Sequence, residues 1–233
     1  MSTQEYIVDY RFGDIHDVRE FITSDYSTKR LAEDLNDVNE VTYYNWKHIK
    51  YPLNVFGEPA PEAVFGYSRQ WLFFYSYKKE PIYIWQFPYE VLVTELGICV
   101  DTANLVTTLL RLVYPSIGGI YTVLGRVYNA DTTEFLGYHA WTQYADKWIE
   151  TTIHEGYGNT DNIYIHNDGN TGELNGIRYI ADIKFNEKEV VEMKSETKQV
   201  LLRFFGPKSD KAQDVDIWKK QEAHKQKAIW KKR

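Results

Sequence analysis

Cysteine is nearly absent from this sequence. The 233 residues include a single one, Cys99, so no disulfide can form within the chain, and a zinc site built from several thiolates is excluded. The histidines other than His139 show no spacing typical of metal ligands, which argues against a metal site. Cys99 is therefore either a small buried hydrophobe or a working thiol.

Long apolar runs and an excess of basic charge are also missing. No stretch approaches the ~20 apolar residues that a membrane-spanning helix needs, and residues 1–12 lack the basic-then-apolar order of a signal peptide. We therefore expect a cytoplasmic or virion-associated protein without a membrane span. A formal net charge of −6 argues against specific nucleic-acid binding, which needs a concentrated basic face.

Aromatic residues, by contrast, are abundant, and 19 Tyr, 11 Phe and 7 Trp predict a core built from large rings. The length predicts one domain over residues 1–205 and a charged helical tail over residues 206–233. From Asp210 onward the tail has eight Lys or Arg against four Asp or Glu. We interpret it as a solvated helix. The alternative is contact with a partner or an anionic surface through Trp218 and Trp230.

Apolar periodicity predicts helices early in the domain and antiparallel strands later. Three-to-four spacing indicates helices within residues 16–50, and residues 99–113 form a second, buried helical pattern without Gly or Pro. Alternation and β-branched content predict strands at residues 120–128, 138–144, 148–153 and 176–185. The segment 161–173 is rich in Asp, Asn and Gly but fails the calcium-loop pattern, so we interpret it as turns.

Three short motifs follow one another in an order that points to chemistry. The first is Gly97-Ile98-Cys99 at a helix start with Ala103 four residues on, the second is His139-Ala140-Trp141 on a strand, and the third is Trp148-Ile149-Glu150-Thr151-Thr152 on the next. Each motif alone is weak, but their order and their placement on a helix and two strands make a stronger signal.

Together with residues 46–51 and 88–92 upstream, these motifs resemble the transglutaminase-like superfamily over roughly residues 16–153. The resemblance implies an α+β fold of the transglutaminase-like or papain-like type. In such a fold the nucleophile stands at the N-terminus of a core helix that packs on an antiparallel β-sheet. It also implies a catalytic triad that contains Cys99 and His139.

The same residues fit the chemistry of thiol catalysis. A helix N-terminus directs free N–H groups and partial positive charge at Cys99, which favours the thiolate. His139 can take the thiol proton and return it to a leaving amine, and an acid at its far nitrogen stabilises the imidazolium. We expect backbone N–H groups near Cys99 to receive the oxyanion, with Gln86 or the Trp85 indole as a further donor. Trp141 is predicted to pack at the lining of the site.

The identity of the acid depends on strand register. If residues 143 and 148 are paired, His139 and Glu150 are diagonal neighbours about 7–8 Å apart at the backbone, within reach of a glutamate. A two-residue loop of Asp146 and Lys147 instead places His139 opposite His154, and Glu155 becomes the rival. The family's usual acid is an aspartate several residues after the tryptophan, whereas Glu150 follows its tryptophan by two.

We therefore predict a cysteine-dependent amide-processing enzyme that needs no cofactor: a hydrolase acting as a thiol protease, deamidase or isopeptidase. Its thiolate would form a thioester acyl-enzyme with a peptide or protein amide, and water would resolve it. One alternative is transfer of the acyl group from a protein glutamine to an amine. Another is a catalytically inactive binding or assembly module that keeps the fold and uses its aromatic surface.

Overall fold

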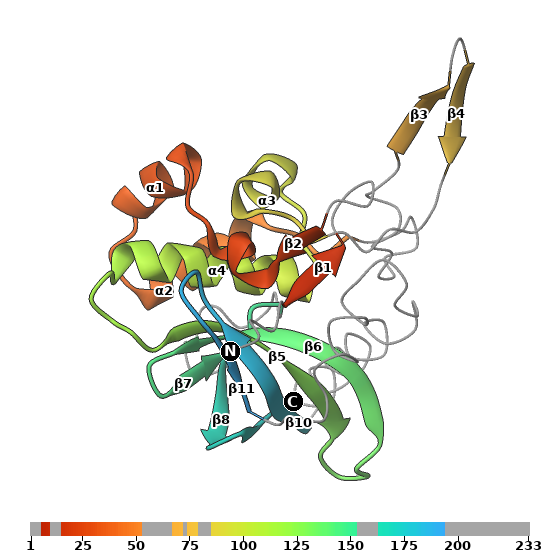
Figure 1. Cartoon of the computed structure of the whole chain (residues 1–233). Coiled ribbons are helices and arrows are strands. Elements are labelled where there is room, and N and C mark those ends of the chain that lie inside the picture. The colour runs from red at the N-terminus through yellow and green to blue at the C-terminus, as the bar shows by residue number, and fades with distance from the viewer. Residues whose placement is uncertain are drawn as a thin grey trace, which may run out of the picture.

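The computed structural model describes residues 6–9, 15–52, 67–71, 74–78, 85–152 and 163–193 (Figure 1). The helices are η2 (Val18–Ile22), α1 (Tyr26–Glu33), α2 (Val38–His48), α3 (Pro88–Thr94) and α4 (Cys99–Val113). Two short antiparallel pairs are β1 (Ile7–Asp9) with β2 (Ile15–Asp17), and β3 (Tyr67–Trp71) with β4 (Phe74–Lys78). The main strands are β5 (Ile120–Asn129), β6 (Phe135–Tyr144), β7 (Lys147–Ile149), β8 (Tyr164–Asp168), β9 (Thr171–Leu174), β10 (Ile177–Phe185) and β11 (Val190–Glu192).

The main strands form a closed antiparallel barrel. Six of them pair in the order β10, β5, β6, β7, β8 and β9, and β9 pairs with β10 to complete the circle. One edge of β10 is shared: residues 177–180 pair with β9, whereas residues 183–185 pair with β11. The register of β10 shifts between Ala181 and Ile183, and such a bulge bends a strand and increases its twist. The bulge thus lies where β10 leaves β9 and meets β11.

This closure corrects the predicted fold class. The sequence was interpreted as a transglutaminase-like or papain-like α+β fold with a helix on an antiparallel sheet, but the strands form a closed six-stranded barrel with few helices. The error arose in the segment 161–173, where the Asp, Asn and Gly residues predicted only turns. The structure places β8 and β9 there, joined by a turn at Gly169 and Asn170. Those two strands supply the pairings that close the barrel.

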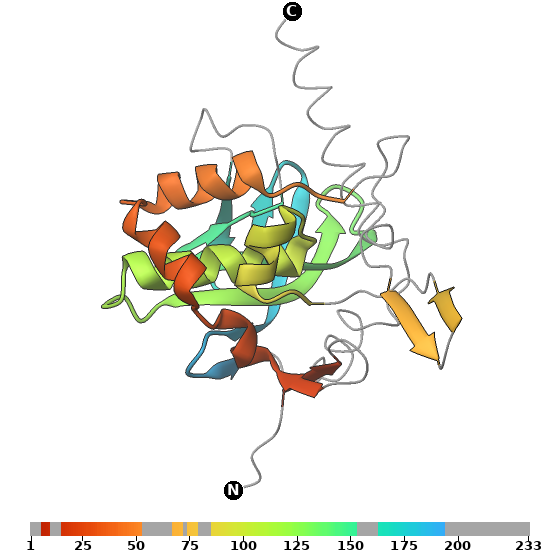
Figure 2. The ribbon, with the colours of Figure 1, turned by 90° about the horizontal axis from the view of Figure 1, so that it is seen from above.

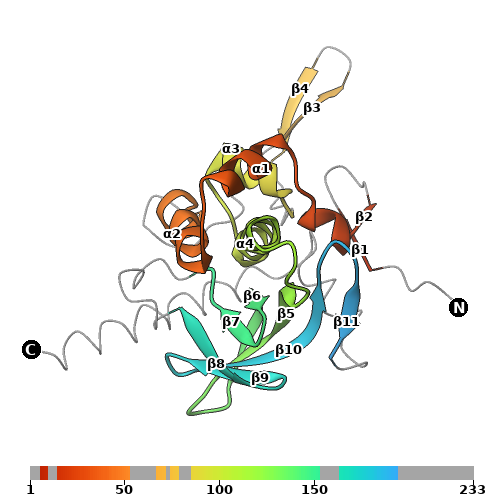
Figure 3. The same cartoon turned by 90° about the vertical axis from the view of Figure 1, so that its left-hand side faces the viewer.

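A layer of helices covers one side of the barrel. Figure 3 looks nearly along α4, which lies between α1, α2 and α3 on one side and β5 and β6 on the other. Figure 2 shows the same layer from above. The side chains of α4 from Cys99 to Leu110 are all buried, because it is covered on one side by strands and on the other by helices. The helix is nevertheless not apolar around its whole circumference, because its buried residues include Asp101, Thr102, Asn104, Thr107 and Thr108.

Alternation along the strands separates two apolar cores. Inside the barrel, Val123, Trp141 and Tyr179 belong to one cluster. Outside it, Leu124 and Ala140 belong to a second cluster with Cys99, on the side that α4 covers. Since neighbouring residues of a strand point to opposite faces, β5 and β6 contribute to both cores at once.

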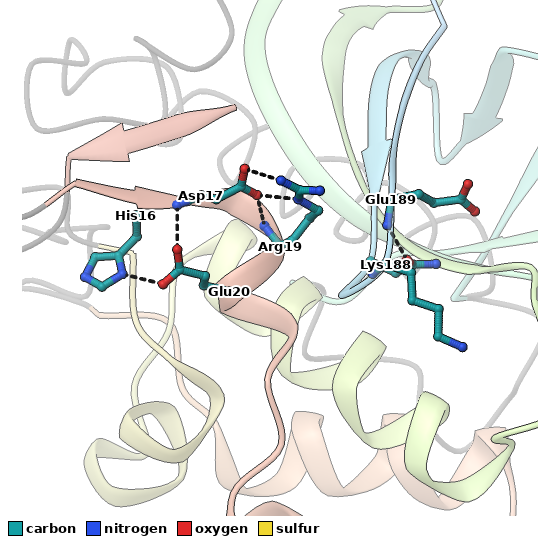
Figure 4. A network of polar contacts seen from close by, with 7 residues as sticks. His16, Asp17, Arg19, Glu20, Lys188 and Glu189 are labelled. Atoms are coloured by element: carbon teal, nitrogen blue, oxygen red, sulfur yellow. Dashed lines mark hydrogen bonds and ion pairs between the residues drawn. The ribbon is translucent and has the colours of Figure 1, made fainter. Parts of the chain in front are cut away.

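The N-terminal turn η2 completes the cluster around Cys99. Asp17 caps η2 by accepting a hydrogen bond from the N–H of Arg19 (2.9 Å), and Glu20 accepts one from the N–H of Asp17 (3.1 Å) (Figure 4). Glu20 also contacts the ring of His16 at 2.7 Å. This capping box fixes the start of the turn and directs Phe21 into the cluster that contains Cys99. Figure 4 also shows the turn between β10 and β11, where the N–H groups of Lys188 and Glu189 donate to the side chain of Asn186.

Several elements agree with the sequence. The helix predicted at residues 99–113 is confirmed with the same bounds, and residues 16–50 contain η2, α1 and α2. The strand predicted at 176–185 is β10, whereas the one at 148–153 ends sooner, at Ile149. The boundary at residue 205 and the tail of residues 206–233 lie outside the described residues.

Gly125 tests the packing of the barrel interior. A Cβ atom there would meet the carbonyl oxygen of Ile180 at 2.1 Å and the Trp141 indole at 2.5 Å. We expect Gly125→Ala to lower the free energy of unfolding by about 3 kcal/mol, as measured by urea denaturation. Gly118→Ala is the matched control, because a Cβ at Gly118 meets nothing within 4 Å. Equal stability of the two variants would contradict this packing.

Candidate active site

Cys99 is the first residue of α4. Ile98 precedes it in an extended conformation (φ −83°, ψ 179°), and the N–H of Ile98 donates to Asp101 at 3.0 Å. An acid in the first turn complements the positive end of the helix dipole, which stabilises the start of the helix at this position. The thiol therefore stands at a helix N-terminus, as predicted. The residue is only 1% exposed and belongs to an apolar cluster.

His139 and Glu150 form a buried hydrogen-bonded pair. Nε2 of His139 lies 2.8 Å from Oε2 of Glu150, and both side chains are buried. The pairing of Gln143 with Trp148 is the register that makes these residues diagonal neighbours. Ala145, at φ 54°, lies in the two-residue turn that sets this register. The structure thus brings these two predicted residues together, and the rival Glu155 lies outside the described residues.

Glu150 is held by three donors. Besides His139, the Tyr179 hydroxyl donates to Oε2 at 2.8 Å and the N–H of Thr152 donates to Oε1 at 2.8 Å. Burial alone would raise the pKa of this carboxyl. The charge and hydrogen bond of His139, with the bonds from Thr152 and Tyr179, outweigh burial and hold the pKa of Glu150 below its ordinary value. The group is therefore an ionised carboxylate at neutral pH.

The start of α4 lies toward the part of β6 that carries His139. The Thr142 hydroxyl donates to the carbonyl of Ala103 at 3.1 Å. Two residues back along β6, Ala140 packs in the same cluster as Cys99. The part of β6 that carries His139 therefore runs alongside the N-terminal end of α4, where Cys99 lies.

Alternation nevertheless gives His139 and Ala140 different faces. The His139 ring contacts Trp141 (centroids 6.5 Å apart) and Tyr179 (6.1 Å), both in the barrel interior. Ala140 instead faces the cluster of Cys99. The pairing of the Cys99 thiol with the His139 ring stays a prediction.

Gln86 anchors the segment that precedes α3. Its backbone N–H donates to Oδ1 of Asp101 at 2.8 Å, and its side-chain amide donates to Oδ2 of Asp101 (3.2 Å) and to the carbonyl of Leu96 (2.8 Å). Its carbonyl oxygen accepts from Thr94 at 3.0 Å. These bonds tie residues 86–96 to the first turn of the helix that carries Cys99. An oxyanion role for Gln86 stays a prediction, and it would require the amide to leave these acceptors.

The two tryptophans predicted at the lining are both buried. Trp85 lies in the cluster of Cys99, between Phe21 (ring centroids 5.1 Å apart) and Phe185 (6.0 Å). Trp141 lies in the barrel interior, edge-on to Tyr179 (5.4 Å), and its indole N–H finds no hydrogen-bond partner in the structure as described. Both contribute large rings around the site, on opposite faces of the barrel wall.

Sequence reasoning missed Tyr179 and Thr152 as partners of Glu150. Thr152 lies in the motif that contains Glu150, but the known turns of this kind are formed by Asp, Asn, Ser and Thr side chains, so no turn rule indicates the partner of a glutamate. Tyr179 lies on a strand that was predicted, but no local pattern shows which distant strand it will face. Within the described ranges, no three His, Cys, Asp or Glu side chains group closely enough to hold a metal ion.

Comparisons with known proteins add little. No protein-family model matches the chain, and no curated protein sequence matches it. Among solved structures, Legionella pneumophila LapG is similar to 77% of this chain and 96% of its own, with a TM-score of 0.38 and 10% identity. A likeness at that score carries no argument about fold or function.

Across the described ranges, no helix has the length and apolar character needed to cross a bilayer.

Asp101 should make stability depend on pH. Burial raises its pKa to about 7, against the hydrogen bonds from Gln86 and Ile98. A carboxyl with a raised folded-state pKa contributes stability below its unfolded pKa, near 3.8, and this contribution is lost as the pH rises through about 7. We expect the free energy of unfolding to fall across that window in urea titrations. Asp101→Asn should flatten the fall, and an unchanged slope would contradict the assignment.

Proposed function

We propose that this chain is a cysteine-dependent amide-processing enzyme in which Cys99 is the nucleophile, His139 the acid and base, and Glu150 the group that holds His139. The observation that carries the proposal is the buried pair of His139 and Glu150 with its 2.8 Å hydrogen bond. A buried ion pair is a poor route to stability, because desolvation offsets most of the attraction. A buried imidazole–carboxylate pair, in a chain whose one cysteine stands at a helix N-terminus, fits catalytic use better.

The helix start supports the role of Cys99. Cys99 is the first residue of α4, and the N–H groups at a helix N-terminus lower the pKa of a thiol and can receive an oxyanion. Because Nε2 of His139 is engaged by Glu150, the proton from the thiol would pass to Nδ1. Glu150 would then stabilise the imidazolium without taking its proton.

The reaction follows from these roles. The sulfur of Cys99 attacks the carbonyl carbon of an amide, the C–N bond breaks, and the amine leaves with the proton held by His139. Water then attacks the thioester, which releases a carboxylate and restores the thiol. We propose hydrolysis of a peptide or protein amide as the main outcome. An amine competing with water at the same thioester would give acyl transfer instead.

A second candidate is a non-catalytic binding or assembly module. The burial of Cys99 in an apolar cluster favours it, since a packed thiol of this kind behaves as a small hydrophobe. The inward orientation of His139 toward Trp141 and Tyr179 supports it as well. Under this reading the thiol would react only when the protein unfolds.

Acyl capture separates the two candidates. We expect p-nitrophenyl acetate to acetylate Cys99 in the native protein, with release of p-nitrophenolate, and acid quenching followed by peptide mass spectrometry to locate the acetyl group. Removing the base in His139→Ala should slow acylation by about 10²- to 10⁴-fold.

The matched controls are Cys99→Ala, which should carry no acetyl group on that peptide, and His166→Ala, an exposed histidine of β8, which should acylate at the native rate. A His139→Ala variant that acylates as fast as the native protein would contradict the enzymatic proposal. Acetylation seen only in denaturant would favour the binding module.

A further inference from the structure

The carboxylate of Glu150 accepts a hydrogen bond that a triad of cysteine, histidine and acid does not require. Oε2 is 2.8 Å from His139 Nε2 and also 2.8 Å from the Tyr179 hydroxyl, so two donors share one oxygen. The other oxygen, Oε1, accepts from the N–H of Thr152. Tyr179 is fully buried and comes from β10, a strand that neither His139 nor Glu150 belongs to.

A second buried carboxyl in the same protein shows what these partners change. Asp101 is also fully buried and accepts three hydrogen bonds, all from N–H groups of Gln86 and Ile98. Burial raises its pKa to about 7, whereas the pKa of Glu150 is lowered. The difference comes first from the charge and hydrogen bond of His139, and the Tyr179 hydroxyl adds a further hydrogen bond to the charged form. Donors to the charged form favour that form.

We propose that Tyr179 is a positioning residue of the site: by donating to Oε2 of Glu150, it keeps the carboxylate charged and fixes the oxygen that orients the His139 ring. This inference rests on the proposed function. The Tyr179 hydroxyl and Nε2 of His139 both bond to Oε2 of Glu150, from two different strands. The carboxylate therefore cannot rotate without breaking a buried hydrogen bond, which is costly.

The ring of Tyr179 and its hydroxyl have separable roles. The ring packs against His139 (centroids 6.1 Å apart) and edge-on against Trp141 (5.4 Å). A phenylalanine keeps both contacts and removes only the donor. The titratable groups that face Glu150 in the described structure are His139 from β6 and Tyr179 from β10. Among the described residues of its own segment, Glu150 receives the uncharged N–H of Thr152. Tyr179→Phe thus removes the donor to Glu150 and keeps the ring in place.

The variant predicts a shifted pH profile. Without the hydroxyl, the pKa of Glu150 rises, so Glu150 becomes protonated at a higher pH as the solution is acidified, and the imidazolium that supports the thiolate loses its partner. The rate at which iodoacetamide alkylates Cys99 should fall as the pH is lowered. We expect the midpoint of this fall (the acid limb of the pH profile) to lie about one pH unit higher in Tyr179→Phe than in the native protein. The pH midpoint of the Glu150 carboxyl carbon, followed by NMR, should move in the same direction.

The matched control is Tyr121→Phe. The Tyr121 hydroxyl also donates to a glutamate, Glu189, at 2.6 Å, but that pair is exposed and lies outside the site. Its alkylation profile should overlay that of the native protein. A general loss of stability in Tyr179→Phe would lower the unfolding midpoint without moving the acid limb measured under native conditions, so the pH profile distinguishes positioning from a purely structural role.

The outcomes separate this inference from the function it rests on. If the native thiol shows a low-pH limb that His139→Ala abolishes, and Tyr179→Phe leaves that limb or the Glu150 midpoint unchanged, the positioning role is overturned and the proposed function stands. If the native thiol titrates as an ordinary cysteine, insensitive to His139→Ala, the proposed function fails, and the positioning role fails with it.

Discussion

The hydrogen bond between His139 and Glu150 inside the barrel is the interaction on which the site depends. It joins two residues from neighbouring strands, His139 in β6 and Glu150 directly after β7. Its strength depends on exclusion of water, because charges interact more strongly in a medium of low dielectric constant. The same exclusion makes an unpaired carboxylate costly. A protein that buries Glu150 must therefore surround it with donors, and three are present.

Closure of the barrel supplies the third donor. β10 pairs with β5 on one edge and with β9 on the other, which brings Tyr179 across the interior to the carboxylate. An open sheet would leave that hydroxyl without a fixed distance to Glu150. Outside the barrel, α4 packs on β5 and β6, and the hydrogen bonds of Gln86 to Asp101 tie the preceding segment to the start of the helix. The barrel thus fixes the His139 ring against Glu150, and α4 places Cys99 in the cluster outside the barrel wall.

What the sequence could predict was local. Apolar periodicity located α4 to the residue, because a buried helix without Gly or Pro leaves a clear pattern. Strand alternation reduced the register to two possibilities, and the structure shows the one that pairs Gln143 with Trp148 and makes His139 and Glu150 diagonal neighbours. These are short-range relations, fixed by the geometry of one hairpin.

The rest depended on contacts distant in the sequence. The strands β8 and β9 were missed because Asn167, Asp168 and Gly169 favour turns, and that preference hid the strands on either side of the turn they form. The fold class was wrong for that reason. Tyr179 as a partner of Glu150 could not be predicted, since the two are 29 residues apart and only barrel closure brings them together. The anchoring of Gln86 by Asp101 likewise depends on packing between a loop and a helix start.

The ultraviolet absorbance of the Cys99 thiolate shows whether His139 activates this thiol. With one cysteine in the chain, the difference between the native protein and Cys99→Ala reports this thiol alone. We expect a thiolate that persists well below the ordinary cysteine pKa of about 8.5 and that His139→Ala returns to the protonated form at neutral pH. A native thiol that ionises at or above that value, with no effect of His139→Ala, would contradict it.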